Sequence, residues 1–452
     1  RRVLFRSAVW LSVWYVRFVF RMFGEKERRD NGIVLGMIVL LGISTVLTGN
    51  EWIGWMNDLI IFVLLVGILL HNFAQDTGWN FGKYLAEIVA AVCGAVCFIG
   101  KPFADGGAFY RSKKTRESHA GWYVLIGICA AVPCLMVLVL LLMSADMVFA
   151  DLLVRFAGVF RFPVKLLRIL LMLVFGFLSS YCGVRYVQKH AADIKPSAGK
   201  TAEPLIAIAF TAPIAVLYLL FSAIQIVYLF IGNMQLPAGV TYAEYARRGF
   251  FQLLFVCVLN LAAVLFIQSY FKENRVLKAL LLAISGCTLI MTASSACRML
   301  LYIRAYQLTF LRVSVLVALA VIALLMAGVI AKIVKPQFPL FRYGFVLVGA
   351  VYLVFSFSHV DYFIAAYNLT HTSWEASGEE TVDYSYLYTL STDAAPAIEK
   401  YAGKSGAADY RKQGWYQLYC EANEEALNAT GLRTYNVSHA VAKQLLMEDN
   451  RE

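Results

Sequence analysis

The sequence predicts an all-α polytopic membrane protein, a helical bundle with a small helical soluble tail at its C-terminus. Of its 452 residues, 60% are hydrophobic and only 15% are charged, whereas soluble domains carry about 25% charged residues. Apolar runs of about 20 residues, the length that an α-helix needs to cross a bilayer, recur along most of the chain. Segments such as 132–143 are apolar on every face, which favours helices over the alternating strands of a membrane barrel.

Ten apolar segments are candidate spans: 32–49, 52–70, 84–100, 121–143, 166–187, 203–231, 249–270, 277–297, 311–333 and 342–363. The segment 3–20 before them contains Arg6 and Arg17 together with Trp and Tyr residues, which is typical of an interfacial helix or a truncated span. The chain therefore divides into a basic N-terminal segment (1–31), a transmembrane domain (32–363) and an acidic tail (364–452).

The formal net charge of +11 is distributed unevenly. Residues 1–363 hold 33 Lys and Arg against 16 Asp and Glu, whereas residues 364–452 hold 7 against 13. Basic residues beside spans mark the cytoplasmic side of a membrane and bind anionic headgroups. The excess therefore indicates membrane topology, with the lipid bilayer and not nucleic acid as the partner.

The most basic loops lie at 101–120, 185–200 and 271–278, and we expect them in the cytoplasm. Seven candidate spans follow the first of these loops, which places the tail outside the cytoplasm. The stretch 21–29 is also basic, yet three candidate spans separate it from 101–120, where an even number is required. Because 84–100 is short and carries Glu87 and Gly94, we interpret it as re-entrant or partly inserted, which leaves nine full spans.

The tail is acidic, Tyr-rich and polar, without a long apolar run. Helical periodicity recurs at 384–390, 394–401, 415–429 and 439–446, with glycines between the segments. We expect a small helical domain that offers a surface to a protein partner.

No catalytic, cofactor-binding or metal-binding motif is found in the sequence. The sequence therefore favours a protein that is not an enzyme, with no cofactor and no metal; the alternative is an enzyme whose catalytic residues are distant from one another in the sequence. Four charged residues lie within about two turns of a span end: Glu87, Asp146, Arg298 and Asp361. Since a side chain at that depth can reach the interface, we favour a structural role for each of them.

Uncharged polar residues gather at similar depth in three spans. Ser285, Thr288, Thr292 and Ser295 are spaced by three, four and three residues, which places them on one stripe of span 277–297. Gln225 and Asn260 add amide groups from two other spans. We favour hydrogen bonding between helices as the role of these residues; the alternative is a polar pathway through the membrane.

A further candidate site lies before span 249–270. Thr241 and Glu244 have the spacing of a capping box, which predicts a helix that begins near Tyr242. Arg247 and Arg248 then fall at headgroup depth on the predicted non-cytoplasmic side, against the positive-inside bias. We expect them to face either the acidic tail or lipid phosphate.

Several segments resemble a known family. They are Leu142-Met-Ser-Ala-Asp-Met-Val-Phe-Ala150, Thr241-Tyr-Ala-Glu-Tyr-Ala-Arg-Arg-Gly-Phe250 and Asp383-x2-Tyr386-Leu-x2-Leu-Ser-x-Asp393-Ala-x-Pro396. The chain is similar over about residues 121–400 to the bacterial multi-pass membrane proteins filed as domain of unknown function number forty-one seventy-three. The resemblance implies a location in the bacterial inner membrane, and it implies no reaction, ligand or active site.

The leading hypothesis is a non-enzymatic membrane sensor or scaffold whose tail meets partners outside the cytoplasm. The alternative is a transporter with a polar path near Gln225, Asn260 and Thr288. A water-filled cavity at the bilayer midplane would favour the transporter.

Overall fold

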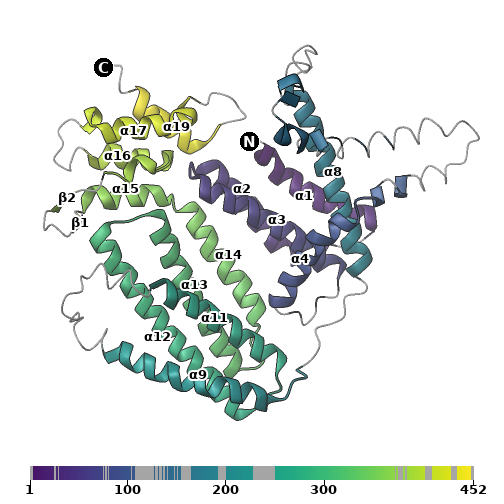
Figure 1. The fold of residues 1–452 in the computed structure, drawn as a ribbon, viewed down its shortest axis with the longest axis vertical. Coiled ribbons are helices and arrows are strands. Elements are labelled where there is room, and N and C mark those ends of the chain that lie inside the picture. The colour runs from purple at the N-terminus through teal and green to yellow at the C-terminus, as the bar shows by residue number, and fades with distance from the viewer. Residues whose placement is uncertain are drawn as a thin grey trace, which may run out of the picture. The chain divides into compact units, whose positions relative to one another are not determined.

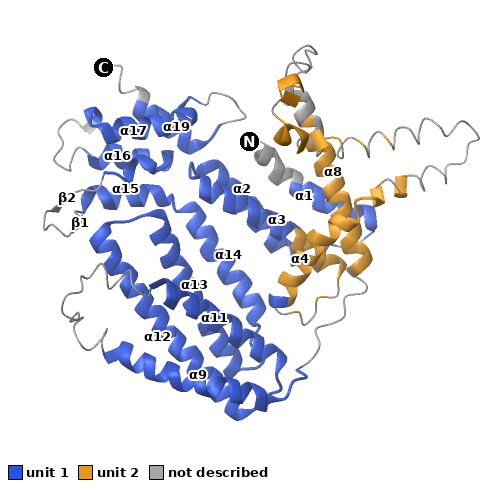
Figure 2. Cartoon of the chain, in the orientation of Figure 1, with its two compact units in different colours: residues 1–65, 80–82, 197–452 blue, residues 66–79, 83–196 orange. Residues whose placement is uncertain are grey.

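The computed structural model describes residues 4–24, 27–28, 30–74, 76, 79, 81–102, 104–106, 164–191, 200–227, 250–371, 373–374, 380–381, 384–402, 410–428 and 435–448, and scattered positions between 127 and 153. These residues are almost entirely helical (Figure 1), which confirms the all-α class. The strands among them are β1 (Ser373–Trp374) and β2 (Glu380–Thr381), an antiparallel pair. The chain forms two compact units, one of residues 1–65, 80–82 and 197–452 and the other of residues 66–79 and 83–196 (Figure 2).

A bundle of five helices forms the centre of the first unit: α9 (Pro204–Gln225), α11 (Phe250–Tyr270), α12 (Arg275–Tyr306), α13 (Phe310–Val334) and α14 (Leu340–Phe357). Helix α12 is the longest and packs against α9, α11 and α13. Its start is fixed by Asn274, whose side chain accepts hydrogen bonds from the N–H groups of Val276 and Leu277. Thr309 caps α13 in the same way.

At one end of this bundle, the loop before α9 meets the loop between α11 and α12. Ala202 forms a β-bridge with Phe271, and the ion pairs Lys200–Glu273 and Lys272–Glu203 both measure 2.8 Å. These residues border two of the loops predicted to be cytoplasmic, so the structure brings parts of both loops to a common end of the bundle.

Three further helices belong wholly or partly to this unit: α1 (Leu4–Phe23), α2 (Asn31–Leu47) and α3 (Glu51–Phe73), the last of which continues into the second unit. Helix α2 packs against α14, where a Cβ at Gly349 would lie 2.2 Å from the Met37 methyl group. The Asn57 side chain of α3 accepts hydrogen bonds from Tyr352 (2.8 Å) and Ser356 (3.0 Å) of α14.

The second unit contains α4 (Phe81–Cys97) from Lys83 onward and α8 (Val164–Ala191) among its described helices. Gly94 allows the Tyr186 ring to pack closely, since a Cβ on Gly94 would lie 2.1 Å from that ring. Arg185 pairs with Asp105 at 2.7 Å. The predicted segment 84–100 thus corresponds to the 17-residue helix α4, in which Gly94 allows close packing against α8.

Six described helices are long and apolar enough to cross a membrane: α3, α9, α11, α12, α13 and α14. Helix α2 is apolar but has only 17 residues. The predicted spans 52–70, 203–231, 249–270, 277–297 and 311–333 correspond to five of the six. The predicted total of nine or ten spans is not confirmed, and segment 121–143 lies largely outside the described residues.

The last predicted span, 342–363, is wrong at its C-terminal end. Helix α14 ends at Phe357, and a separate helix, α15 (Val360–Thr370), follows. His359 between them has φ 47° and ψ 58°, the left-handed conformation, which cannot continue a right-handed helix.

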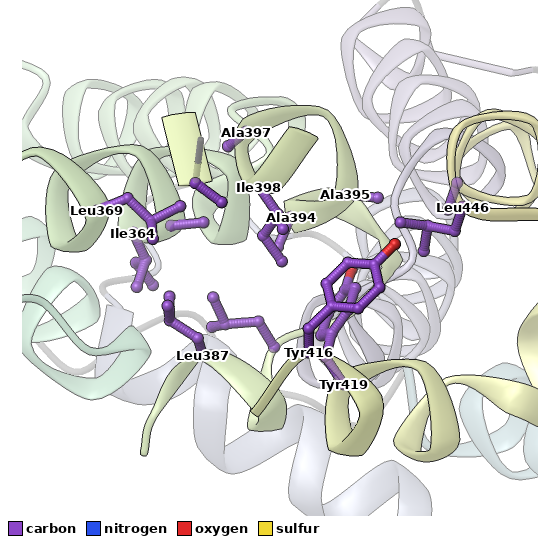
Figure 3. Packing of buried hydrophobic residues seen from close by; sticks show 14 of the residues in the cluster. Ile364, Leu369, Leu387, Ala394, Ala395, Ala397, Ile398, Tyr416, Tyr419 and Leu446 are labelled. Atoms are coloured by element: carbon purple, nitrogen blue, oxygen red, sulfur yellow. The ribbon is translucent and has the colours of Figure 1, made fainter. Parts of the chain in front are cut away.

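Helix α15 begins a C-terminal subdomain, residues 360–448. It continues with η2 (Leu387–Thr389), η3 (Thr392–Ala394), α16 (Ala395–Tyr401), η5 (Tyr410–Lys412), α17 (Gly414–Ala422), α18 (Glu424–Leu427), α19 (Val437–Lys443) and a π turn (Gln444–Glu448). Its core gathers Ile364, Leu387, Ile398 and Tyr419 (Figure 3). Ile53 of α3 belongs to the same cluster, so this core is continuous with the membrane helices.

Candidate functional site

The four described candidates from the sequence lie buried in the bundle. Asn260 of α11 joins three helices, because it accepts a hydrogen bond from the Tyr218 hydroxyl of α9 (2.9 Å) and donates one to Thr288 of α12 (3.0 Å). At the C-terminal end of α9, Gln225 accepts a hydrogen bond from Ser294 of α12 (2.7 Å). We call Gln225, Asn260, Thr288, Thr292 and their partners the polar stripe.

The two threonines of the polar stripe bond mainly within α12. Thr288 donates to the carbonyl of Ile284 and Thr292 to that of Thr288, both at 2.7 Å. Thr292 also lies 3.4 Å from the sulfur of Cys257 on α11. The stripe is therefore a set of hydrogen bonds that crosslinks α9, α11 and α12. The other candidates, Glu244, Arg247 and Arg248, lie outside the described residues.

A second buried polar region, which the sequence did not reveal, lies where the C-terminal subdomain meets the membrane helices. Asp393 of η3 has a fully buried side chain. Its carboxylate accepts hydrogen bonds from the backbone N–H of Gly49 (2.7 Å) and from the Thr48 hydroxyl, both in the loop between α2 and α3. Its Oδ1 also lies 3.5 Å from His359 Nδ1. One carboxylate thus holds two segments that are over 300 residues apart.

Asp361 of α15 is the second carboxylate at this junction. It accepts hydrogen bonds from the Asn50 amide (2.9 Å) and from the Ser391 hydroxyl (2.6 Å). Asn50 at the same time accepts a bond from the Ile53 N–H and so caps α3. Ser391 likewise accepts a bond from the Asp393 N–H, which links the two carboxylates. We call Asp361, Asp393, His359 and these donors the carboxylate network.

The burial of Asp361 differs from what the sequence indicated. A charged residue near a span end was expected to reach the membrane interface, but Asp361 is only 2% exposed. The break at His359 separates α15 from α14, and Asp361 at the start of α15 packs between Asn50 and Ser391 instead.

The three ionisable groups of the network differ in their pKa shifts. Burial opposes ionisation of Asp393, but hydrogen bonds from His359, Ser438, Thr48 and the Gly49 N–H outweigh it and lower the pKa of Asp393. Burial raises the pKa of Asp361, and the nearby charge of Asp393 adds to that rise. The hydrogen bond to Asp393 raises the pKa of His359. The arrangement favours a charged His359–Asp393 pair beside a carboxyl group that resists ionisation.

Backbone groups of α2 complete the junction. Asn436, the N-cap of α19, donates to the carbonyl of Thr48 at 2.7 Å, a group left free at the helix end. Gly49 lies so close to η3 that a Cβ there would be 2.1 Å from the Thr392 hydroxyl and 3.0 Å from that of Ser438. The junction therefore requires glycine at position 49.

The loop between α12 and α13 makes a second contact with the subdomain. The Asn368 side chain of α15 accepts from the Leu308 N–H and donates to the Leu308 carbonyl, both at 2.9 Å. The Phe310 N–H donates to the Tyr386 hydroxyl (3.0 Å). Asn368 and Asn436, each of which begins an Asn-x-Ser/Thr triplet in the sequence, are thus buried in this junction and serve as hydrogen-bond partners.

A family model described as "Domain of unknown function (DUF4153)" matches residues 35–401. The chain belongs to this family. The predicted membership in a family of unknown function is confirmed, and the family number is 4153, where the motifs suggested forty-one seventy-three. Searches of curated proteins and of solved structures found no match.

The matched region of this DUF4153 chain includes Asn50, His359, Asp361 and Asp393. It ends before α19, which adds Asn436 and Ser438 to the junction. Asp393 and Ser391 stand in the tail motif that carried the resemblance, and Asp361 was one of the charged residues near a span end. Those two signals together could have indicated the site, but the pairing of residues so far apart is not visible in any local spacing.

Proposed function

We propose that this protein is a non-enzymatic sensor or scaffold of the bacterial inner membrane, whose C-terminal subdomain lies outside the cytoplasm and passes its binding state to the membrane helices. The observation that carries the proposal is that the Asp393 carboxylate accepts buried hydrogen bonds from Thr48 and Gly49. A subdomain on a flexible linker could bind partners without affecting the helices. This one cannot move without breaking buried hydrogen bonds to the loop between α2 and α3.

The distribution of charge supports the proposed orientation. Seven basic residues lie at or near the end of the bundle opposite the subdomain: Lys200, Lys272, Arg275, Lys278, Lys332, Lys335 and Arg342. Toward the subdomain end, the described basic residues of the bundle are Arg298, Arg304 and Arg312. The Arg312 side chain donates to the carbonyls of Tyr306 and Gln307 and lies over the Tyr302 ring. The positive-inside rule then assigns the Lys-rich end to the cytoplasm.

The transporter alternative has less support from the geometry. Gln225, Asn260, Thr288 and Thr292 are all buried and each is hydrogen-bonded within the bundle. These contacts are those expected of residues that hold helices together in lipid.

Orientation is tested with a peptide tag fused at Glu452 and an impermeant probe on intact cells. We expect labelling before the inner membrane is breached. Cys420 of the tail is a poorer probe, because it is half-buried and burial raises the pKa of its thiol, so it reacts slowly even where the reagent has access. A tag that is labelled only after lysis contradicts the proposal.

Coupling is tested by Gly49→Ala, with Gly54→Ala as the matched control, because a Cβ at Gly54 has no neighbour within 4 Å. We expect the first variant to raise hydrogen exchange in η3 and at the end of α2 together, and the second to leave both unchanged. Exchange that rises in η3 alone would show that the subdomain moves independently of the helices.

A further inference from the structure

We infer that the carboxylate network is an acid-favoured clamp: protonated His359 holds Asp393 in place, and loss of that proton loosens the C-terminal subdomain from the loop between α2 and α3. This inference rests on the proposed function, since it assigns a regulating signal to the same junction. His359 stands at the break between α14 and α15, so it belongs to the segment that joins the membrane helices to the subdomain.

His359 is both accessible and bonded, as a proton sensor must be. Its side chain is 44% exposed, while that of Asp393 is fully buried. Protons can therefore reach the imidazole while the carboxylate stays shielded from water. A buried carboxylate is less favourable without a cation beside it, even where uncharged groups donate to it. Neutralisation of His359 therefore weakens the contact that Asp393 makes with Thr48 and Gly49.

Within the part of the chain that the structure describes, no cation other than His359 is among the groups that set the pKa of Asp393. From α19 and the loop between α2 and α3, the groups that hydrogen-bond to Asp393 are the uncharged Ser438, Thr48 and Gly49. Asp361 of α15 carries the same sign of charge as Asp393 when it is ionised. Burial, together with the charges of both carboxylates, raises the pKa of Tyr419 of α17. Burial and the charge of Asp361 raise the pKa of Tyr386, while the charge of Arg312 opposes this rise. His439, also on α19, is buried and adds a second titratable ring near the junction.

The pKa shifts of His359, Asp361 and Asp393 determine how docking of the subdomain depends on pH. Because the pKa of His359 is raised from 6.5, its contribution to docking is complete below pH 6.5 and is lost as the pH rises through the higher pKa of the docked state. The raised pKa of Asp361 acts in the same direction, and its contribution is lost above pH 3.8. The lowered pKa of Asp393 makes its contribution present above pH 3.8 and lost as the pH falls below that value. Docking is therefore tightest in mild acid and weaker in alkali.

The test uses the full-length protein purified in detergent and measures hydrogen exchange in peptides that cover 48–53 and 390–395, corrected for the intrinsic effect of pH. The Gly49 N–H reports directly because it bonds to Asp393. We expect protection in wild type to fall by up to about tenfold per pH unit across the His359 titration, the limit for one linked proton. A wild-type protein with constant protection from pH 5 to pH 9 overturns the inference.

Three variants assign the response. His359→Asn removes the titration and tolerates the left-handed backbone, so we expect weaker protection that no longer falls with pH. His359→Arg places at position 359 a side chain that stays positively charged in alkali, so this variant should hold the junction closed there. The control is His371→Asn, at the C-cap of α15, where the His371 ring contacts Tyr367 and Thr370; this variant should behave as wild type. A full pH response in His359→Asn would assign it to Asp361 or His439 and refute the clamp.

Failure of this inference is distinguishable from failure of the proposed function. The exchange measurement does not depend on membrane orientation, whereas the tag at Glu452 reads orientation alone. A cytoplasmic tag with a normal pH response defeats the sensor proposal and leaves the clamp standing. An outer tag with a flat pH response does the reverse.

Discussion

The polar stripe and the carboxylate network are both buried and both join distant helices, yet their chemistry differs. The stripe, within the candidate spans α9, α11 and α12, uses amides and hydroxyls. The network, beyond the end of α14, uses two carboxylates and a histidine. Charge at the centre of a bilayer costs roughly 2.5–3.5 kcal/mol per residue, whereas an interhelical hydrogen bond there contributes about 0.6–2 kcal/mol. Uncharged polar groups therefore join the helices inside the bundle, and the carboxylates and the histidine lie at its end, where a charge costs less.

The largest effect is expected from Asp393→Ala. It leaves the Gly49 N–H and the Thr48 hydroxyl buried without an acceptor, and breaking a buried charged contact costs about 3–5 kcal/mol. We expect the subdomain to detach, seen as loss of exchange protection in 390–402 and a lower melting temperature.

A matched control for that variant is Glu399→Gln, which breaks the partly exposed Glu399–Arg411 pair (2.8 Å) within the subdomain. Its expected cost is below about 1 kcal/mol. If the two variants destabilise the protein equally, the network has no special role.

Next in size is Gly49→Ala, which introduces a methyl group against Thr392. Overpacking of this kind costs about 1–3 kcal/mol. The melting temperature should fall relative to Gly54→Ala. Because no hydrogen-bonding or titratable group is lost, the pH response of the junction should survive. The variant therefore distinguishes the contribution of packing from that of charge.

The double variant Thr288→Val with Thr292→Val tests the polar stripe. It removes the Thr288 hydroxyl from Asn260 and the Thr292 hydroxyl from Cys257 without burying a charge. We expect a loss of about 1–2 kcal/mol in thermal stability with normal membrane insertion and no change in pH response. Unchanged stability together with loss of a transport phenotype would instead favour the polar path.

The smallest effect is expected at the opposite end of the bundle. Lys272→Gln breaks an ion pair with Glu203 in which the side chains are 53% and 65% exposed. Such a pair contributes about 0–1 kcal/mol, and salt screens it. Glu273 nearby has its pKa lowered to about 2 by Lys200 and Lys278, so any contribution it makes is lost only as the pH falls from 4.5 toward that value. Melting curves between pH 5 and pH 8 should not distinguish Lys272→Gln from wild type.

Sequence patterns predicted the polar stripe better than the carboxylate network, for a physical reason. The spacing of Thr288 and Thr292 is a local property of one helix, and apolar length alone located α9, α11, α12 and α13. The network depends on contacts between loops and helix ends far apart in the chain, such as Asn50 with Asp361. The break at His359 was hidden because apolar residues flank it on both sides, and Ser358 and His359 alone do not specify a left-handed turn.

The central claim, that the C-terminal subdomain and the membrane helices are energetically one unit through Asp393, is tested most directly by a double-mutant cycle. Thr48→Val and Asp393→Asn, alone and combined, are compared by the free energy of opening derived from hydrogen exchange in 48–53. We predict a coupling energy of about 1–3 kcal/mol, as expected for residues in one hydrogen-bonded network. Effects that add to within about 0.5 kcal/mol would contradict the account.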